Sequence, residues 1–366
     1  MISDKVKGKL GFGCMRLPMI EKEIDKAEFN KMIDAYIKAG FNYFDTAYGY
    51  IEGKSQTAIR DCLSSRYNRE DFVLANKLSY WCFENEEDVP ALFEKQLELC
   101  GVEYFDFYLF HSMNHEAYEK HKRCNTFDIV KKLKDEGKIK HIGMSFHDTA
   151  EFLDKVLTEQ PYMEVVQLQI NYLDYDDPTV QSKACYDVAV KHGKKVVVME
   201  PVRGGALANL PEEASDVLKN LGNESQASYA LRYAATFPEV FMVLSGMGNM
   251  EMMNDNIKTF TNFVPVEEKD MEVFSKVRQI IRRLKQIPCT KCNYCAEVCP
   301  SGIPVSELFS IYNNLQGAKV SRNETKELLN PYREKIESCI KCKKCESNCP
   351  QNIKISEMIE KIGAIK

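Results

Sequence analysis

The chain has 366 residues, of which 44% are hydrophobic and 28% are charged, a composition typical of a globular protein with about two domains. The formal net charge of −5 argues against a general nucleic-acid binder. No apolar run reaches the length of about 18 residues that a membrane-spanning helix needs. The first residues lack the apolar segment of a secretion signal, and we therefore expect a cytoplasmic protein.

Short apolar, β-branched runs alternate with amphipathic stretches as far as about residue 263. The amphipathic stretches have helical spacing, and Gly40, Gly137 and Gly193 lie where helices would stop. Strands that are joined by helices are parallel, because a parallel connection needs a crossover. Eight such units in about 250 residues fit a (β/α)8 barrel better than an open sheet. The expected strands are 9–15, 43–47, 72–77, 105–111, 139–146, 165–170, 195–199 and 240–246.

The cysteines follow a different pattern from the rest of the chain. Eight of the 14 lie between Cys289 and Cys349. A disulfide scaffold would be small and secreted, so metal binding is the better interpretation. We therefore expect a (β/α)8 barrel over residues 1–265 and a small, mostly helical, ferredoxin-like domain over residues 266–366.

The eight cysteines form two copies of the pattern C-x2-C-x2-C-x3-C-P. Three cysteines at this spacing wrap three corners of a cuboidal [4Fe–4S] cluster, and the fourth ligates the companion cluster. Zinc is the alternative, but it commonly takes two spaced pairs and would not explain this spacing. The helical segment between the motifs resembles that of ferredoxin domains attached to larger redox enzymes. We assign one cluster to Cys289, Cys292, Cys295 and Cys349, and the other to Cys339, Cys342, Cys345 and Cys299.

Four lysines flank the cysteines: Lys291, Lys341, Lys343 and Lys344. Positive charge near a cluster raises the reduction potential of the cluster and could steer an acidic ferredoxin or flavodoxin-like partner toward it. A solvated face that offsets the negative charge of the clusters is the simpler interpretation, and we favour it.

Polar residues stand where several expected strands end, which is where barrels of this kind carry their chemistry. Asp45, Lys77 and His111 are three of them, and Tyr50 follows Asp45 by five residues. An ammonium group lowers the pKa of a neighbouring phenol, and a carboxylate keeps the ammonium charged and aimed. This set predicts a tyrosine proton donor. Without the other residues, Asp45 and Lys77 could form a salt bridge with a purely structural role. A lone histidine near a protein core is likewise more often structural than catalytic.

The motifs around these residues resemble those of the aldo-keto reductase family, and the whole chain resembles the branch with a carboxy-terminal double-[4Fe–4S] domain. The resemblance implies an NAD(P)H-dependent oxidoreductase that reduces a small-molecule carbonyl. It implies that Tyr50 is the general acid, that Lys77 and Asp45 tune it, and that His111 orients the carbonyl. The resembling segments are 11–18, 44–50, 76–77, 108–111 and 137–145.

The family binds an extended NAD(H) or NADP(H) across the barrel mouth without a Rossmann fingerprint, and the chain departs from the family pattern at three places. Phe146 stands where Asn is usual, Met199 replaces a stacking aromatic ring, and Gly246 and Met252 replace basic residues that often bind the 2′-phosphate. We therefore expect NADH to bind at least as well as NADPH. By resemblance, the dinucleotide contacts would come from Ser145, Gln167, Pro201, Arg203, Gly204, Gly205, Asp255 and Asn256.

A hydride carries two electrons, whereas each cluster takes one. A flavin would split the pair, but no recognisable flavin motif supports one. Three functions therefore stay open. The first is a carbonyl reductase whose clusters either stabilise the carboxy-terminal domain or supply electrons. The second is a module that transfers electrons between a barrel-bound nucleotide or flavin and a ferredoxin-type partner, and the third is a nucleotide sensor. The intact set of Asp45, Tyr50, Lys77 and His111 favours the first, and the paired clusters favour the second.

The aromatic loop 79–83 could line a substrate pocket or seal the barrel rim.

Overall fold

The computed structural model describes residues 4–284, 286–317 and 319–365. The chain forms two compact units. The first comprises residues 1–201 and 227–266, and the second comprises residues 202–226 and 267–366. Residues 202–226, which we expected in the barrel domain, thus group with the carboxy-terminal residues. No helix in the described ranges combines the length and apolar character needed to cross a membrane.

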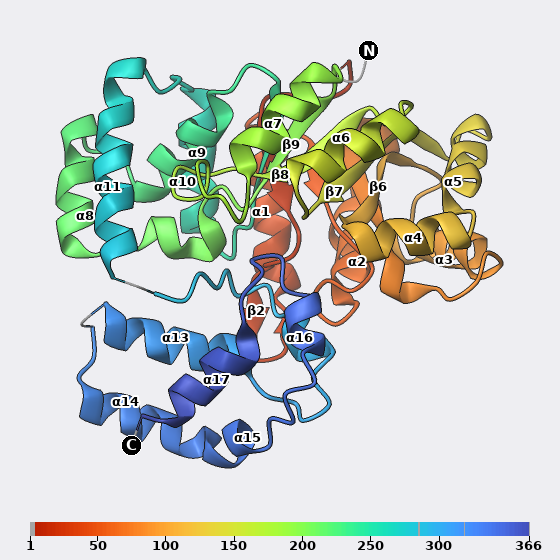
Figure 1. Cartoon of the computed structure of the whole chain (residues 1–366). Coiled ribbons are helices and arrows are strands. Elements are labelled where there is room, and N and C mark those ends of the chain that lie inside the picture. Colours follow the sequence, from red (N-terminus) through yellow and green to blue (C-terminus); the bar gives the residue numbers. More distant parts are fainter. Residues whose placement is uncertain (1–3, 285, 318, 366) are drawn as a thin grey trace. The chain divides into compact units, whose positions relative to one another are not determined.

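The first unit is a closed barrel of eight parallel strands, which confirms the predicted (β/α)8 fold (Figure 1). Each of the eight expected apolar runs overlaps one of its strands, although β5 and β6 each continue two residues further, and each strand pairs with its two neighbours in chain order around the barrel. The strands are β1 (Leu10–Gly13), β4 (Tyr43–Asp45), β5 (Val73–Ser79), β6 (Phe105–Met113), β7 (Ile139–Phe146), β8 (Val165–Gln169), β9 (Lys195–Met199) and β10 (Val240–Ser245).

Amphipathic helices connect the strands. The first of them begins at the N-cap Asp25, whose side chain accepts hydrogen bonds from two backbone N–H groups, and it stops just before Gly40 at φ 91°. A two-stranded hairpin, β2 (Met19–Ile20) and β3 (Glu23–Ile24), precedes it. The helices are α1 (Lys26–Lys38), α2 (Lys54–Ile59), α3 (Asp88–Cys100), α4 (His115–Arg123), α5 (Thr126–Asp135), α6 (Ala150–Glu159), α7 (Ser182–Lys191), α9 (Gln226–Ala235) and α10 (Met250–Thr261).

The interior of the barrel changes from apolar to polar along three neighbouring strands, β4, β5 and β6. Successive interior positions lie two residues apart, because side chains alternate between the two faces of a strand. Apolar side chains of Tyr43, Ala75 and Leu109 pack together in the core. Two residues further along the same strands come Asp45, Lys77 and His111, and Ser79 follows Lys77 by two. The strand period therefore turns all four polar residues toward the carboxyl-end mouth of the barrel.

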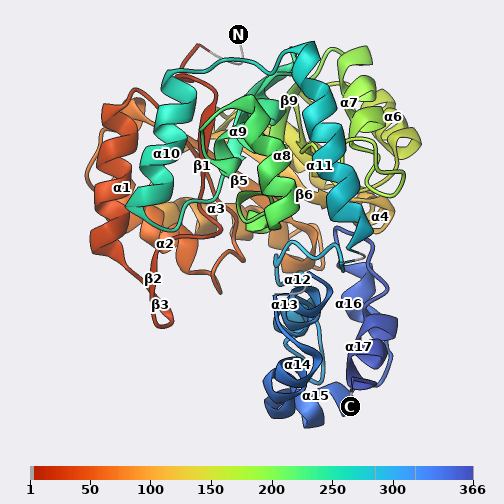
Figure 2. The ribbon, with the colours of Figure 1, turned by 90° about the vertical axis from the view of Figure 1, so that its left-hand side faces the viewer.

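The second unit is helical (Figure 2). Its helix α8 (Glu212–Leu218) packs against α11 (Met271–Arg283), and the Arg283 guanidinium lies 2.6 Å from the Glu213 carboxylate. The helices that carry the cysteine loops share an apolar core that includes Leu308, Leu329 and Ile359. They are α12 (Tyr294–Glu297), α13 (Val305–Gln316), α14 (Arg322–Leu329), α15 (Arg333–Glu337), α16 (Lys344–Ser347) and α17 (Ile355–Gly363).

Candidate functional site

A buried ion pair lies at the carboxyl ends of β4 and β5. Lys77 Nζ donates to Asp45 Oδ1 at 2.5 Å and to the carbonyl oxygen of Thr46 at 2.9 Å. Lys77 is fully buried and Asp45 is 3% exposed. Burial raises the pKa of Asp45, and the charge of Lys77 opposes that shift. The second carboxylate oxygen of Asp45 is buried and has no hydrogen-bond partner among the described residues, so the neighbouring ammonium is its main stabilisation.

Tyr50 lies on the loop after β4, above this ion pair. The ammonium nitrogen of Lys77 is 4.9 Å from the centroid of the Tyr50 ring, and Tyr50 is 8% exposed. The next two residues, Ile51 and Glu52, both have φ of 54°. This conformation is strained for a β-branched residue such as isoleucine and costs about 1–3 kcal/mol. The surrounding structure therefore holds the loop that carries Tyr50 in a conformation that the loop alone would not favour.

His111 lies in β6 beside Tyr50 and is 3% exposed. Its ring centroid is 5.9 Å from that of Tyr50, in an edge-to-face arrangement, and 5.0 Å from that of Trp81. Burial, and after it the charge of Lys77, lowers the pKa of His111 well below its usual value. The imidazole is therefore neutral near pH 7, with one nitrogen able to donate a hydrogen bond and the other able to accept one.

Sequence reasoning missed Ser79, which is the hydrogen-bond partner of His111. Ser79 Oγ lies 2.6 Å from His111 Nδ1, and Ser79 and His111 are opposite each other in the register of β5 and β6. A signal was available, because Ser79 follows Lys77 by two and so shares its face of the strand. The aromatic loop that follows contributes Trp81, which is 37% exposed, to the side of the His111 ring.

The residues expected to hold the nicotinamide lie at the ends of β7 and β8, which are neighbouring strands. Ser145 Oγ accepts a hydrogen bond from the backbone N–H of Ser112 at 2.8 Å. Gln167 Nε2 donates to the sulfur of Met199 at 3.6 Å. In the part of the chain that the structure describes, the buried amide oxygen of Gln167 has no hydrogen-bond partner. An orphaned acceptor of this kind fits a ligand that offers an N–H group, as a nicotinamide carboxamide does.

The residues expected near the adenine and the pyrophosphate have other contacts. Asn256, in α10, is buried and its Nδ2 donates to Ser245 Oγ at 2.7 Å, so it holds α10 to the end of β10. Asp255 is half-buried on the same helix, and Pro201 is buried just after β9. Arg203, Gly204 and Gly205 belong to the second unit and start the segment 202–226.

In the second unit the glycine pair lies against the first cysteine motif. Gly204 has φ of 62°, and a Cβ atom built on it would lie 2.1 Å from the carbonyl oxygen of Thr290. Gly205 also has a left-handed φ, of 92°, but a Cβ atom there would meet nothing within 4 Å. Thr290 directly follows Cys289 in the chain. The backbone of the segment after β9 therefore touches the backbone of a cysteine loop.

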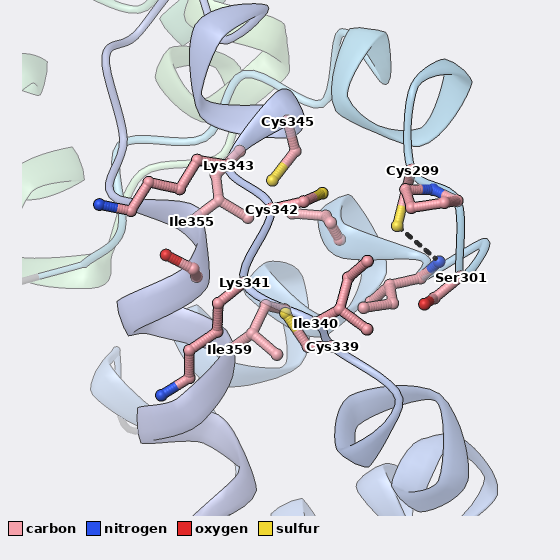
Figure 3. A pocket seen from close by; sticks show the side chains of 14 residues that line it. Cys299, Ser301, Cys339, Ile340, Lys341, Cys342, Lys343, Cys345, Ile355 and Ile359 are labelled. Carbon is pink, nitrogen blue, oxygen red and sulfur yellow. Dashed lines mark hydrogen bonds between the residues drawn. The ribbon is translucent and has the colours of Figure 1, made fainter.

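The eight motif cysteines line two cavities in the predicted combination. One cavity is lined by Cys289, Cys292, Cys295 and Cys349, and the other by Cys299, Cys339, Cys342 and Cys345. Figure 3 shows the second cavity, where the cysteine side chains surround a common space while those of Lys341 and Lys343 extend away from it. Each motif thus supplies three cysteines to one cavity and its fourth cysteine to the other.

The two cysteine loops share one backbone conformation. Lys291 and Lys341 have φ of 58° and 53°, and two residues later Asn293 and Lys343 have φ of 65° and 60°. Backbone N–H groups point at the sulfurs, as in the hydrogen bond from Ile303 N to Cys299 Sγ at 3.5 Å. Such N–H···S bonds are among the means by which proteins set cluster potentials. No group of three or more His, Cys, Asp or Glu in the described part of the chain is arranged to hold a single metal ion.

Two family models account for most of the sequence. Residues 9–279 match the model of the aldo/keto reductase family. The chain belongs to the aldo/keto reductase family. Residues 288–353 of this aldo/keto reductase match the model of a 4Fe-4S dicluster domain. The enzyme is therefore an oxidoreductase whose sequence continues, after the barrel, into a 4Fe-4S dicluster domain.

Individual relatives of this aldo/keto reductase agree with the family assignment. It is 23% identical to the uncharacterized oxidoreductase YqkF of Bacillus subtilis over 76% of this chain and 95% of that protein. It is 28% identical to a 9,11-endoperoxide prostaglandin H2 reductase of Trypanosoma cruzi, over 62% of this chain and 73% of the other.

Solved structures show the same fold. An aldo-keto reductase from Bacillus halodurans, in its holo form, superposes with a TM-score of 0.62 at 22% identity, covering 74% of this chain and 91% of that one. One from Klebsiella pneumoniae, in complex with NADP and acetate, superposes with a TM-score of 0.60 at 18% identity, covering 74% and 90%.

Proposed function

We propose that this aldo/keto reductase reduces a small-molecule carbonyl to an alcohol with NAD(P)H, and that Tyr50 supplies the proton. The observation that carries the proposal is the convergence of four side chains at one mouth of the barrel. Lys77 lies within hydrogen-bond distance of Asp45 and beneath the Tyr50 ring, and His111 lies against the edge of that ring. Groups that converge from different strands of a barrel are typical of a catalytic site.

Each residue has a distinct task in this mechanism. NAD(P)H, when bound, supplies a hydride to the carbonyl carbon. The phenol of Tyr50 gives its proton to the carbonyl oxygen, so that carbonyl, NAD(P)H and one proton become alcohol and NAD(P)⁺. The phenolate that remains is stabilised by the ammonium of Lys77, which Asp45 keeps charged. Neutral His111 donates a hydrogen bond to the carbonyl oxygen and orients it.

We propose that the nicotinamide contacts Ser145 and Gln167, because the orphaned amide oxygen of Gln167 needs a donor. The aldo-keto reductase of Klebsiella pneumoniae, which was solved with NADP, supports a nicotinamide cofactor. Gly246 is exposed, and the neighbouring Arg16 lies 4.0 Å from the carboxylate of Glu200. Because Glu200 offsets that charge, NADH should bind at least as well as NADPH. Fluorescence titrations with both dinucleotides measure this, and much tighter binding of NADPH would contradict it.

We propose that the two four-cysteine cavities hold two [4Fe–4S] clusters. Burial raises the pKa of the Cys295 thiol to about 12, so its thiolate needs a compensating positive charge, which iron provides. The sharing of cysteines between the two motifs is expected of paired clusters and not of two independent zinc sites. Anaerobic purification followed by iron and sulfide analysis tests this, with eight of each expected per chain.

Tyr50→Phe tests the proposed reduction. This change removes one hydroxyl and keeps the ring that packs against His111. We expect turnover of an aldehyde panel with NADH to fall by about 10²- to 10⁴-fold, the usual contribution of a positioned general acid. NADH affinity and the absorption of the clusters should not change. Undiminished aldehyde reduction by Tyr50→Phe, or no turnover of any carbonyl by the wild type, would refute the proposal.

A second candidate function is electron transfer to an acidic ferredoxin or flavodoxin-like partner. It is favoured by one observation: Ile340 is 69% exposed and lies beside the exposed Cys342 on the lysine-bearing loop. An apolar residue within a basic rim is typical of a transient docking surface. Bleaching of the cluster absorption by NADH would support electron flow within the chain. Survival of NADH-to-dye transfer in Tyr50→Phe would separate it from carbonyl reduction.

The six cysteines outside the two motifs indicate the cellular compartment of the protein. Among the described residues those of the barrel form no disulfide, and five of them are buried: Cys14, Cys62, Cys100, Cys124 and Cys185. Cysteines without disulfides and iron–sulfur ligands are typical of a reducing compartment, and we propose that the protein is cytoplasmic.

A further inference from the structure

The hydroxyl of Ser79 has one hydrogen-bond partner among the described residues, the Nδ1 atom of His111, at 2.6 Å. Both residues are buried, with exposed fractions of 0% and 3%. They are direct neighbours across β5 and β6, so the contact is set by the register of two central strands and not by a mobile loop. The lysine of the proposed proton-donor system, Lys77, lies two residues before Ser79 on the same face of β5.

The direction of this hydrogen bond follows from counting protons. A serine hydroxyl carries one proton, and neutral histidine carries its proton on one nitrogen. If His111 Nδ1–H donated to Ser79, the serine proton would be buried with no acceptor among the described residues, which is unfavourable. If Ser79 donates to Nδ1, both groups are satisfied. The second arrangement requires the histidine proton to be on Nε2.

The charges around His111 favour the neutral ring. The ammonium of Lys77 repels a second positive charge. His147, after β7, is itself neutral near pH 7, because burial lowers its pKa to about 4. The rings of Tyr50, from the loop after β4, and Trp81, from the loop after β5, contact two sides of the imidazole and carry no charge. At this position, which is 3% exposed, burial disfavours a charged imidazole as well.

We propose that Ser79 is a positioning residue that holds His111 in the tautomer with its proton on Nε2, ready to donate to the oxygen of the carbonyl substrate. The last clause rests on the proposed carbonyl reduction, whereas the tautomer itself does not. In the opposite tautomer, Nε2 would be an acceptor and would repel the lone pairs of a carbonyl oxygen. Ser79 would therefore determine whether His111 assists the reaction.

Nuclear magnetic resonance of the full-length protein with ¹⁵N-labelled histidine rings tests the tautomer directly. His111→Gln identifies the His111 signals among those of six histidines. We expect the wild type to carry the proton on Nε2, Ser79→Thr to keep it there, and Ser79→Ala to shift the population toward Nδ1. A wild-type proton on Nδ1, or an unchanged tautomer in Ser79→Ala, would overturn the proposal. If Ser79→Ala does not fold, the wild-type spectrum by itself still tests whether the His111 proton is on Nε2.

Steady-state kinetics distinguish a role of Ser79 in positioning His111 from a role in packing alone. We expect kcat to fall about tenfold in Ser79→Ala, equivalent to 1.4 kcal/mol, with the KM for NADH unchanged and kcat restored to within a few-fold in Ser79→Thr. Ser182→Ala is the matched control, because the Ser182 hydroxyl is also buried but has no hydrogen-bond partner within the described ranges. Equal losses in Ser79→Ala and Ser182→Ala would show a structural role. If no carbonyl is turned over, the proposed function fails while the spectra still test the tautomer.

Discussion

The backbone of Gly204 lies against the backbone of Thr290, so closely that a Cβ atom on Gly204 would lie 2.1 Å from the Thr290 carbonyl oxygen. The two residues are far apart in the sequence. One follows the barrel strand β9, and the other stands inside the first cysteine motif. Within the second unit this contact connects the segment 202–226 to the loop of one four-cysteine cavity.

Gly204→Ala should therefore damage the first cysteine loop. The substitution places a methyl group in contact with a backbone carbonyl that cannot rotate away, and it forces alanine into a left-handed conformation that costs about 1–2 kcal/mol by itself. We expect a lower melting temperature for the second unit and loss of iron from the cavity of Cys289. Gly205→Ala is the control, because it shares the left-handed φ but has open space. Equal stability and iron content in the two variants would contradict the prediction.

The fourth cysteine of each motif should ligate the cluster of the other motif. Cys292 and Cys349 line one cavity, whereas Cys299 lines the other. The double variant Cys292→Ser/Cys349→Ser should lose one cluster and keep four iron atoms, because both substituted cysteines line the same cavity. The double variant Cys292→Ser/Cys299→Ser should lose both clusters. Iron analysis and electron paramagnetic resonance distinguish the two, and the opposite pattern would show that each motif closes on itself.

Asp45→Asn should impair both stability and reaction. A neutral amide leaves the fully buried ammonium of Lys77 without its counter-charge, and breaking a buried ion pair in this way costs about 3–5 kcal/mol. We expect lower resistance to urea and a large fall in carbonyl turnover. Asp106→Asn is the control, because the buried Asp106 forms an ion pair with the half-buried Arg69 at 2.6 Å where β6 begins. That variant should lose stability but keep its turnover at temperatures where it is folded.

The barrel should lose stability as the pH falls below about 6.5, the pKa of histidine in an unfolded chain. Burial lowers the pKa of His121 to about 3, and its Nε2 atom has no hydrogen-bond partner. Because the native state resists protonation and the unfolded state does not, stability is full above pH 6.5 and declines down to about pH 3. The slope is about 1.4 kcal/mol per pH unit for this histidine.

Urea unfolding of the wild type and of His121→Gln between pH 7.5 and 5 measures this dependence. His121→Gln should be less stable at pH 7.5, because its amide needs new partners among Phe83, Phe110 and Phe127, which surround the ring. Its free energy of unfolding should, however, fall less steeply with pH than that of the wild type. Parallel pH dependences would show that His121 does not contribute to acid sensitivity.

The barrel and the grouping of the cysteines could be predicted because their signals are local. An apolar run such as 105–111 fits a strand whatever the rest of the chain does, and β6 occupies Phe105–Met113. The period of two along β5 also places Lys77 on the face of the strand that Ala75 uses in the core. The cysteine spacing determines how many corners of a cluster one loop can reach, and the two cavities have the predicted sets of four.

Other features depend on which distant segments meet. The sequence contains Ser79 and His111, but only the register of β5 against β6 places their polar atoms 2.6 Å apart. It contains Gly204 and Gly205 side by side, yet only the tertiary structure shows that the segment that they begin groups with the carboxy-terminal residues and that Gly204 contacts Thr290. Local periodicity and spacing act over a few residues and can be recognised in the chain alone. Partner choice and hydrogen-bond direction depend on packing between residues that are far apart in the sequence, and only the tertiary structure determines them.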